Sequence, residues 1–229
     1  MTYVVPAPQV VSIPVSGKPE RFPVNRIYCV GRNYVEHAQE MGYTGREPPF
    51  FFMKPADAIV VADPDAGIPY PPRTENFHYE AELVVAIGVG GKNIAAADAA
   101  QHIYGYAVGL DMTRRDLQID MRKQGRPWDI GKGFDHSAPI SPIVPAAQAA
   151  NIGQADISLA VNGATKQSSN IQKLIWNIGE VIEHLSASWE LKAGDLIYTG
   201  TPEGVGPVVR GDVMTVSVDG LPGIRVSVT

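Results

Sequence analysis

The sequence of 229 residues predicts an α+β fold that is rich in short strands and has few helices. Its 23 glycines and 19 prolines exceed the usual share of these residues, which indicates many tight turns. Seven segments are apolar, or alternate between apolar and polar residues, over the length of a strand. Only four segments have a helical pattern, so strands dominate the expected fold.

The expected strands are separated by segments with turn-forming residues. They cover residues 26–30, 58–62, 82–88, 104–110, 158–161, 195–199 and 213–218. The last of them alternates apolar and polar residues throughout, the pattern of a strand with one buried face. Between strands, Asp63-Pro64-Asp65, Asn162-Gly163 and Asp219-Gly220 supply turn chemistry.

The four expected helices cover residues 33–41, 96–100, 113–125 and 171–185. Thr113 and Asp116 have the spacing of a helix start, with Thr113 as the N-cap. Asn33 and Glu36 have the spacing of a capping box, and Gly42 is a helix stop.

No internal repeat, low-complexity tract or linker divides the chain, so we expect one domain over residues 1–229. Residues 1–23 are rich in proline and valine, and are expected to form a peripheral arm or hairpin. Residues 24–229 are expected to form the core.

The composition excludes several classes of partner. With 19 Lys and Arg against 24 Asp and Glu, the net charge is −5, and no basic stripe is present, so we expect no nucleic-acid partner. The longest apolar run, near residues 83–89, is too short to cross a bilayer, so we expect no membrane partner. The N-terminus lacks the features of a signal peptide, which favours a cytoplasmic protein.

The single cysteine, Cys29, excludes an internal disulfide and is expected in the core.

Two glutamates at the start of an apolar strand predict a cation site. Residues i and i+2 of a strand project to the same face, so Glu80 and Glu82 converge. The apolar residues that follow place this pair near the interior, where a hard cation would offset the repulsion. Asp111, which ends another apolar strand, is the expected third ligand of Mg²⁺ or Mn²⁺. The alternative is two solvated glutamates and a helix-capping Asp111.

Basic and amide groups follow Asp111. Arg115 and Gln118 lie three apart on one face of the expected helix, and suit a carboxylated, oxygen-rich substrate. The alternative is an Arg115 that pairs with Asp116 or Asp120 on the solvent side. Lys132, flanked by glycines in an expected loop, is a candidate for holding an oxyanion, the alternative being a solvated lysine.

His37 and Glu40 lie at i and i+3 of the first expected helix and are within contact reach. A carboxylate beside an imidazole sets its tautomer and raises its basicity, an arrangement that activates water. An ordinary pair on a helix surface is the alternative.

Taken in order, these motifs resemble the fumarylacetoacetate hydrolase superfamily in its short single-domain form. The resemblance covers nearly all of the chain from residue 26 onward. The segments that carry it are Tyr28-Cys29-Val30-Gly31-Arg32-Asn33-Tyr34 with His37 and Glu40, Phe52-Met53-Lys54-Pro55, His78-Tyr79-Glu80-Ala81-Glu82-Leu83, Gly109-Leu110-Asp111-Met112-Thr113-Arg114-Arg115-Asp116, Gly131-Lys132-Gly133-Phe134-Asp135 and Thr199-Gly200-Thr201-Pro202-Glu203-Gly204-Val205-Gly206-Pro207.

The resemblance implies a β-rich roll of mixed sheets, a homodimer and a role for each candidate residue. Glu80, Glu82 and Asp111 would be the Mg²⁺ or Mn²⁺ ligands. His37, Glu40 and Lys132 would be catalytic, with the first two activating water. Arg115, Gln118 and Thr201 would bind the substrate.

The implied reaction is cleavage of the carbon–carbon bond of an acylpyruvate, with fumarylpyruvate of gentisate catabolism as the expected substrate. Arg32, Arg73 and Arg126 each remain candidates for the distal carboxylate. Oxaloacetate decarboxylation and keto–enol tautomerisation or isomerisation are alternatives on the same metal site. The non-enzymatic alternative is a binding module with a structural Ca²⁺, which the full set of polar residues in matching order disfavours.

Overall fold

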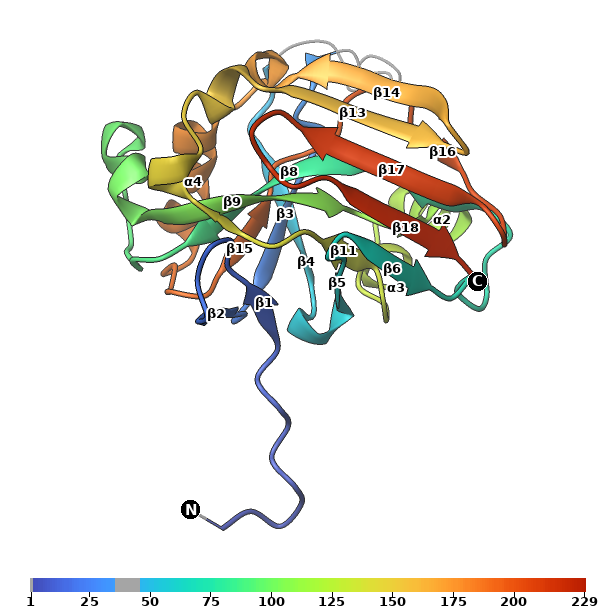
Figure 1. The fold of residues 1–229 in the computed structure, drawn as a ribbon, viewed down its shortest axis with the longest axis horizontal. Helices are drawn as coiled ribbons and strands as arrows, with labels where there is room; N and C mark the ends of the chain where they lie inside the picture. Colours follow the sequence, from blue (N-terminus) through green and yellow to red (C-terminus); the bar gives the residue numbers. More distant parts are fainter. Residues whose placement is uncertain (1, 36–45) are drawn as a thin grey trace.

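The computed structural model describes residues 2–35 and 46–229, and its strands dominate the fold (Figure 1). The strands are β1 (Ser12–Pro14), β2 (Arg21–Pro23), β3 (Ile27–Gly31), β4 (Phe50–Lys54), β5 (Ile59–Val61), β6 (Asp65–Ile68), β7 (Phe77–Tyr79), β8 (Ala81–Ile87), β9 (Ile103–Leu110), β10 (Thr113–Arg114), β11 (Ala138–Ile140), β12 (Val144–Pro145), β13 (Asp156–Val161), β14 (Ala164–Asn170), β15 (Leu196–Tyr198), β16 (Gly206–Pro207), β17 (Val213–Val218) and β18 (Ile224–Val228). The helices are α2 (Arg115–Lys123), α3 (Asp129–Lys132) and α4 (Ile178–Ser188), with 3₁₀ turns η1 (Ala56–Ala58), η2 (Ala96–His102), η3 (Ala146–Gln148), η4 (Ile152–Gln154) and η5 (Ile171–Lys173).

Two large sheets carry the core. The larger has the order β4-β3-β15-β8-β9-β11-β5, with β12 paired to β9, and mixes parallel and antiparallel neighbours. The five-stranded sheet has the order β14-β13-β17-β18-β6. In Figure 1, β13, β17 and β18 cross in front of β8 and β9, so the apolar faces of the two sheets meet. This mixed, strongly curved β architecture with few helices confirms the predicted fold class.

Strand β8 lies at the centre and is buried on both faces. Leu83 and Val85 belong to the apolar cluster between the two sheets. Val84 and Ala86, which project to the opposite face, belong to a second cluster. A strand buried on both sides must be apolar throughout, which explains why this segment reads as a continuous apolar run.

Each of the seven expected strands is present, as β3, β5, β8, β9, β13, β15 and β17. The strands that the sequence did not predict are mostly two to five residues long, and an alternating pattern cannot be recognised over so few residues. The longer β14 was missed because most of its residues are polar and exposed.

The expected helix over residues 171–185 is wrong over its first seven residues and present over the rest. The segment contains the short turn η5, and the helix α4 begins only at Ile178. Asn177 accepts a hydrogen bond from the backbone N–H of Glu180, while the Glu180 side chain accepts one from the backbone N–H of Asn177. This capping box sets the helix start.

The other expected helices also differ from the structure. Thr113 is not an N-cap, because residues 113 and 114 form β10 against β7, and α2 begins at Arg115. The expected helix over 96–100 is the 3₁₀ turn η2. Most of the expected helix over 33–41 lies outside the described residues, and within them the Asn33 amide donates to the carbonyls of Trp176 and Thr199.

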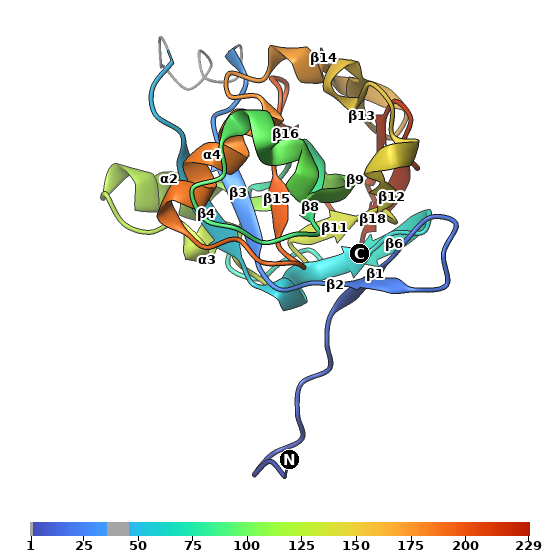
Figure 2. The same cartoon turned by 90° about the vertical axis from the view of Figure 1, so that its left-hand side faces the viewer.

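The first residues form a hairpin and an extended segment. Strands β1 and β2 pair, and Ile13 and Phe22 are buried in the cluster that also holds Val84. Residues 2–10 are exposed, and Figure 2 shows the N-terminal segment leading away from the sheets. The division into an arm at 1–23 and a core at 24–229 stays a prediction.

Cys29 is fully buried in β3, which confirms that it belongs to the core. Burial raises the pKa of its thiol well above the usual value.

Among residues 2–35 and 46–229, no helix is long and apolar enough to cross a membrane.

Candidate metal and substrate site

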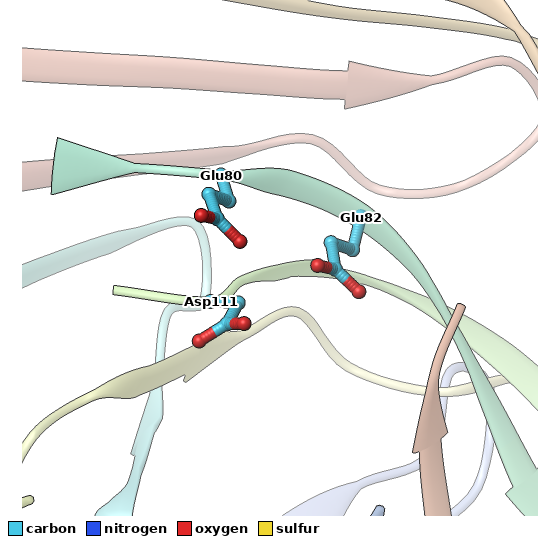
Figure 3. Close-up of side chains that lie close together, drawn as sticks. All are labelled: Glu80, Glu82 and Asp111. Carbon is cyan, nitrogen blue, oxygen red and sulfur yellow. The ribbon is translucent and has the colours of Figure 1, made fainter. Parts of the chain in front are cut away.

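Three buried carboxylates converge at one end of β8 and β9. Each of Glu80, Glu82 and Asp111 offers an oxygen, and these oxygens lie within 4.8 Å of one another (Figure 3). Strand β8 runs antiparallel to β9, so the start of one strand lies beside the end of the other. The backbone N–H of Asp111 donates to the Glu80 carbonyl over 2.9 Å, which holds the two chain segments together.

Burial decides between the alternatives for this cluster. Glu80 is 5% exposed, Glu82 2% and Asp111 0%, so the solvated-glutamate alternative is wrong. Three carboxylates this deep in the protein require positive charge beside them.

Cationic side chains supply part of that charge. Lys132 Nζ lies 2.8 Å from Glu80 Oε2 and 2.6 Å from Asp111 Oδ2. Lys54 Nζ lies 2.8 Å from Asp111 Oδ1, and the Arg115 guanidinium donates to Glu80 Oε1. Glu80 and Asp111 are therefore each held by two cations.

Glu82 is held differently. Its Oε2 accepts a hydrogen bond of 2.7 Å from the backbone N–H of Gly200, and none of the ion pairs among the described residues includes it. Burial, and then the charges of Asp111 and Glu80, raise the pKa of this carboxyl well above its usual value. Glu82 is thus the carboxylate of the three with most to gain from a bound cation.

The donor set fits a hard divalent cation. Asp111 Oδ1 is buried and receives no hydrogen bond, since its contact with Lys54 has the distance of an ion pair without hydrogen-bond geometry. A set of three carboxylate oxygens is typical of Mg²⁺ and Mn²⁺ sites.

Lys132 lies on a short helix rather than in the expected loop. It is the last residue of α3 and is only 2% exposed, so the solvated-lysine alternative is wrong. A third bond from its ammonium, to Thr113 Oγ1 over 2.7 Å, completes its donor set. Burial opposes the charged form of Lys132, but Asp111 and Glu80 outweigh it and raise its pKa.

Arg115 and Gln118 lie in the first turn of α2, and both side chains are buried. They therefore share the interior face of the helix, as the i, i+3 spacing predicts. Arg115 donates to Gln118 Oε1 over 3.3 Å, and its Nε donates to His78 Nδ1 over 3.4 Å. Asp116 instead accepts from the Thr74 hydroxyl at 2.5 Å, so the alternative pairing of Arg115 on the solvent side is wrong.

Thr201 lies directly after Gly200, in the segment that follows β15. Its hydroxyl accepts a hydrogen bond of 2.9 Å from Gln167 Nε2. It lines one central cavity together with five other predicted site residues, Glu80, Glu82, Arg115, Gln118 and Lys132, whereas Asp111 lies beside Glu80 without lining the cavity. The structure therefore brings together six residues that are spread over more than half of the chain. His37 and Glu40 lie outside the described residues, and their roles stay predictions.

Sequence reasoning missed Lys54 and Gln167. Lys54 is the last residue of the edge strand β4 and is 2% exposed. A lysine at the end of the apolar run Phe50-Phe51-Phe52-Met53 was the available indication of a buried cation. Gln167 accepts from the Ala81 N–H, between the two glutamates, but nothing in the polar segment around it marks this role.

Comparisons with known proteins agree with this geometry. Residues 26–229 match the family model described as the fumarylacetoacetate hydrolase C-terminal domain. A fumarylpyruvate hydrolase of Ralstonia sp. is 52% identical over 182 residues, which cover 80% of this chain and 93% of the relative. An oxaloacetate tautomerase of Escherichia coli is 40% identical, over 87% of this chain and 90% of the relative.

A solved structure gives the same result. The crystal structure of fumarylpyruvate hydrolase from Pseudomonas aeruginosa, in complex with Mn²⁺ and pyruvate, has a TM-score of 0.96 and 52% sequence identity, and the match covers 100% of this chain and 99% of that one. The chain described here belongs to the fumarylacetoacetate hydrolase family.

Proposed function

We propose that the protein is a metal-dependent hydrolase that cleaves the carbon–carbon bond of an acylpyruvate, with fumarylpyruvate as the substrate and fumarate and pyruvate as the products. The observation that carries the proposal is the cluster of three buried carboxylates, two of which, Glu80 and Glu82, line the central cavity together with Arg115, Gln118 and Lys132. The names of the Ralstonia and Pseudomonas relatives support this choice of substrate.

Glu80, Glu82 and Asp111 would hold Mg²⁺ or Mn²⁺. When bound, the cation supplies Lewis-acid stabilisation of negative charge on the oxygens of an oxo acid. The ion complements Glu82 in particular, which has the least positive charge beside it.

The surrounding side chains bind and orient the pyruvate half of the substrate. The Arg115 guanidinium suits its carboxylate, because Arg recognises carboxylates through two donors in one plane. Gln118 accepts from Arg115 through Oε1 and also lines the cavity, so its amide N–H groups would be left to donate to the substrate. Thr201, which also lines the cavity, would add a hydroxyl.

His37 and Glu40 act as the water-activating pair. The imidazole removes a proton from water, whose oxygen attacks the distal carbonyl carbon of the substrate. The bond between this carbon and the adjacent methylene then breaks, and its electron pair leaves on the pyruvate enolate. The Lys132 ammonium, in reach of the cavity, stabilises that oxyanion before a proton reaches the methylene carbon.

A second candidate reaction is tautomerisation of oxaloacetate, favoured by the 40% identical relative of Escherichia coli. An oxaloacetate decarboxylase of Dictyostelium discoideum, 36% identical, supports decarboxylation in the same way. Each of these reactions develops an enolate that Lys132 and Arg115 would stabilise equally well, so the site alone does not choose among them.

The experiment follows the enol absorbance of fumarylpyruvate with EDTA-treated protein, before and after Mg²⁺ or Mn²⁺ is added, while pyruvate and fumarate are measured. Metal-dependent, equimolar products, abolished by Glu82→Ala and strongly reduced by Lys132→Met, establish the hydrolase. Lys92→Met, which removes an exposed lysine, is the matched control. Turnover of oxaloacetate without cleavage of fumarylpyruvate would assign the second candidate instead.

We propose further that the protein is a cytoplasmic homodimer with one catalytic domain, 1–229. The molar mass of the protein, measured by light scattering after size-exclusion chromatography at several concentrations, tests the dimer. A monomer at micromolar concentration would contradict it.

A further inference from the structure

A second, larger cleft adjoins the central cavity. It has a volume of about 660 Å³ and lies between the edge strand β4 and the loop that joins α2 to α3. Arg32, Phe52 and Trp128 line both the cleft and the central cavity, and so form the boundary between them. An elongated molecule held by its pyruvate half would extend past these three side chains into the cleft.

Aromatic rings form a rigid wall at this boundary. Phe50 and Trp128 lie edge to face with centroids 5.2 Å apart, and Phe52 lies 5.8 Å from Trp128. The Arg32 guanidinium lies 4.8 Å from the Phe50 centroid. Flat, apolar surfaces of this kind suit the planar, unsaturated chain of an enoyl group.

The charge of the cleft is positive. Its charged lining residues are three arginines, Arg32, Arg122 and Arg126, against a single carboxylate, Asp129. An anionic end group on an apolar chain matches both the rings and this charge.

The backbone of Arg126 is fixed, although its side chain is exposed. Helix α2 ends in a turn in which Gly125, at φ +62°, donates to the Arg122 carbonyl, and Arg126 donates to the Met121 carbonyl over 2.9 Å. This pair of bonds is the Schellman arrangement that closes a helix C-terminus. The turn therefore delivers Arg126 to the cleft from a rigid support rather than from a loose loop.

Arg73, the third candidate for the distal carboxylate, does not lie in the cleft. It lines neither the central cavity nor the cleft, and the next residue, Thr74, lines a different pocket with Arg210. Of the arginines left open by the sequence, the geometry thus retains Arg32 at the boundary and Arg126 in the cleft itself.

We propose that this cleft is the subsite for the acyl half of the substrate, and that Arg126 binds a carboxylate at its distal end. The inference rests on the proposed function and narrows the substrate class to acylpyruvates that end in a carboxylate. The aromatic boundary holds the unsaturated chain, and Arg126 selects the charged end.

The test compares fumarylpyruvate with crotonylpyruvate, which carries a methyl group in place of the distal carboxylate. In Arg126→Leu, the ratio of kcat/KM for the two substrates falls by about 10- to 100-fold, as expected for the loss of a hydrogen bond to a charged group. Arg126→Lys restores part of the ratio. Arg73→Leu, the matched control outside the cleft, leaves the ratio at the wild-type value.

A binding measurement separates failure of the subsite from failure of the proposed reaction. Calorimetry with Mn²⁺-loaded protein compares fumarate with crotonate, which requires no turnover. A preference for fumarate that Arg126→Leu removes supports the subsite even if neither acylpyruvate is cleaved. The proposed subsite would be overturned if Arg126→Leu left both the kcat/KM ratio and the preference for fumarate unchanged. It would also be overturned if Arg73→Leu lowered the ratio and the preference as much as Arg126→Leu does.

Discussion

The ammonium group of Lys54 lies 2.8 Å from Asp111 Oδ1, in a contact where both side chains are almost completely buried. Lys54 also donates to the backbone carbonyls of Met112 and Lys132. The lysine thereby ties β4 to the segment after β9 and to the end of α3. Lys54 contacts the proposed metal ligand Asp111 but does not itself line the central cavity.

Replacing Lys54 with methionine should lower the free energy of unfolding by about 3 kcal/mol or more, because it leaves a buried carboxylate and two carbonyls without this cation. Denaturant unfolding of the metal-free protein measures the change. The exposed Lys92→Met is the control and should stay within ~0.5 kcal/mol of the wild type. An equally small effect of Lys54→Met would mean that Asp111 does not need this partner.

Glu82→Gln should have opposite effects with and without metal. In metal-free protein the change removes a buried charge that faces two other carboxylates, while the Gln oxygen still accepts from Gly200, so the melting temperature should rise. With Mn²⁺ the stabilisation seen in the wild type should be lost. Thermal melts in EDTA and in Mn²⁺ measure both effects, with exposed Asp98→Asn as the control. A lower metal-free melting temperature would contradict the prediction.

The same carboxyl predicts a pH dependence. Because the folded pKa of Glu82 is raised above its unfolded value of about 4.3, the folded protein holds this proton more tightly. The contribution of Glu82 to metal-free stability is therefore fully present below about pH 4.3 and is lost as pH rises through the folded pKa. The stability difference between Glu82→Gln and the wild type should widen over this rise. A difference independent of pH would show that Glu82 is ionised throughout.

His78 should remain neutral well below neutral pH. Burial, followed by the positive charge of Arg115, lowers the pKa of its imidazole to about 4. Stability linked to this group is thus lost as pH falls from the unfolded value of about 6.5 towards 4, where the folded ring must charge. Ring ¹⁵N shifts across pH 8 to about 5 should stay those of the neutral form. A midpoint near 6.5 would contradict the burial of the ring beside Arg115.

Gly131→Ala should disturb the site through the backbone. A Cβ at Gly131 would lie 2.8 Å from the backbone nitrogen of Gln118, so α3 and α2 would have to separate. Because these helices carry Lys132, Arg115 and Gln118, kcat/KM should fall at least about 10-fold, with a stability loss of ~1–3 kcal/mol. Gly153→Ala, where a Cβ meets nothing within 4 Å, is the matched control. Equal kinetics of the two variants would contradict the close packing.

Much of the site follows from local rules that act along the chain. Strand alternation puts Glu80 and Glu82 on one face, and the apolar run behind them predicts their burial. The i, i+3 spacing of Arg115 and Gln118 likewise makes them neighbours once a helix forms. These relationships involve residues close in sequence, so the pattern of residue types suffices to predict them.

Element boundaries were harder to predict, because competing local contacts decide them. Thr113 has the residue type of an N-cap, yet pairing of β10 with β7 extends the strand conformation through it. Similarly, a good apolar pattern over residues 171–185 is interrupted where Asn177 and Glu180 form a capping box. The tertiary structure settles which of two locally acceptable conformations prevails.

The sequence by itself predicted the family through the order of its motifs, and it predicted the strand-rich fold and the clustering of the three carboxylates through residue type and periodicity along the chain. Only the tertiary structure decided which cations balance those carboxylates and which arginine reaches the cleft. Lys54 ends β4 and Asp111 follows β9, two strands that are not adjacent in the sheet, and Arg73 and Arg126 differ only in where the fold carries them. Such choices depend on distances across the folded protein, which a one-dimensional pattern does not contain.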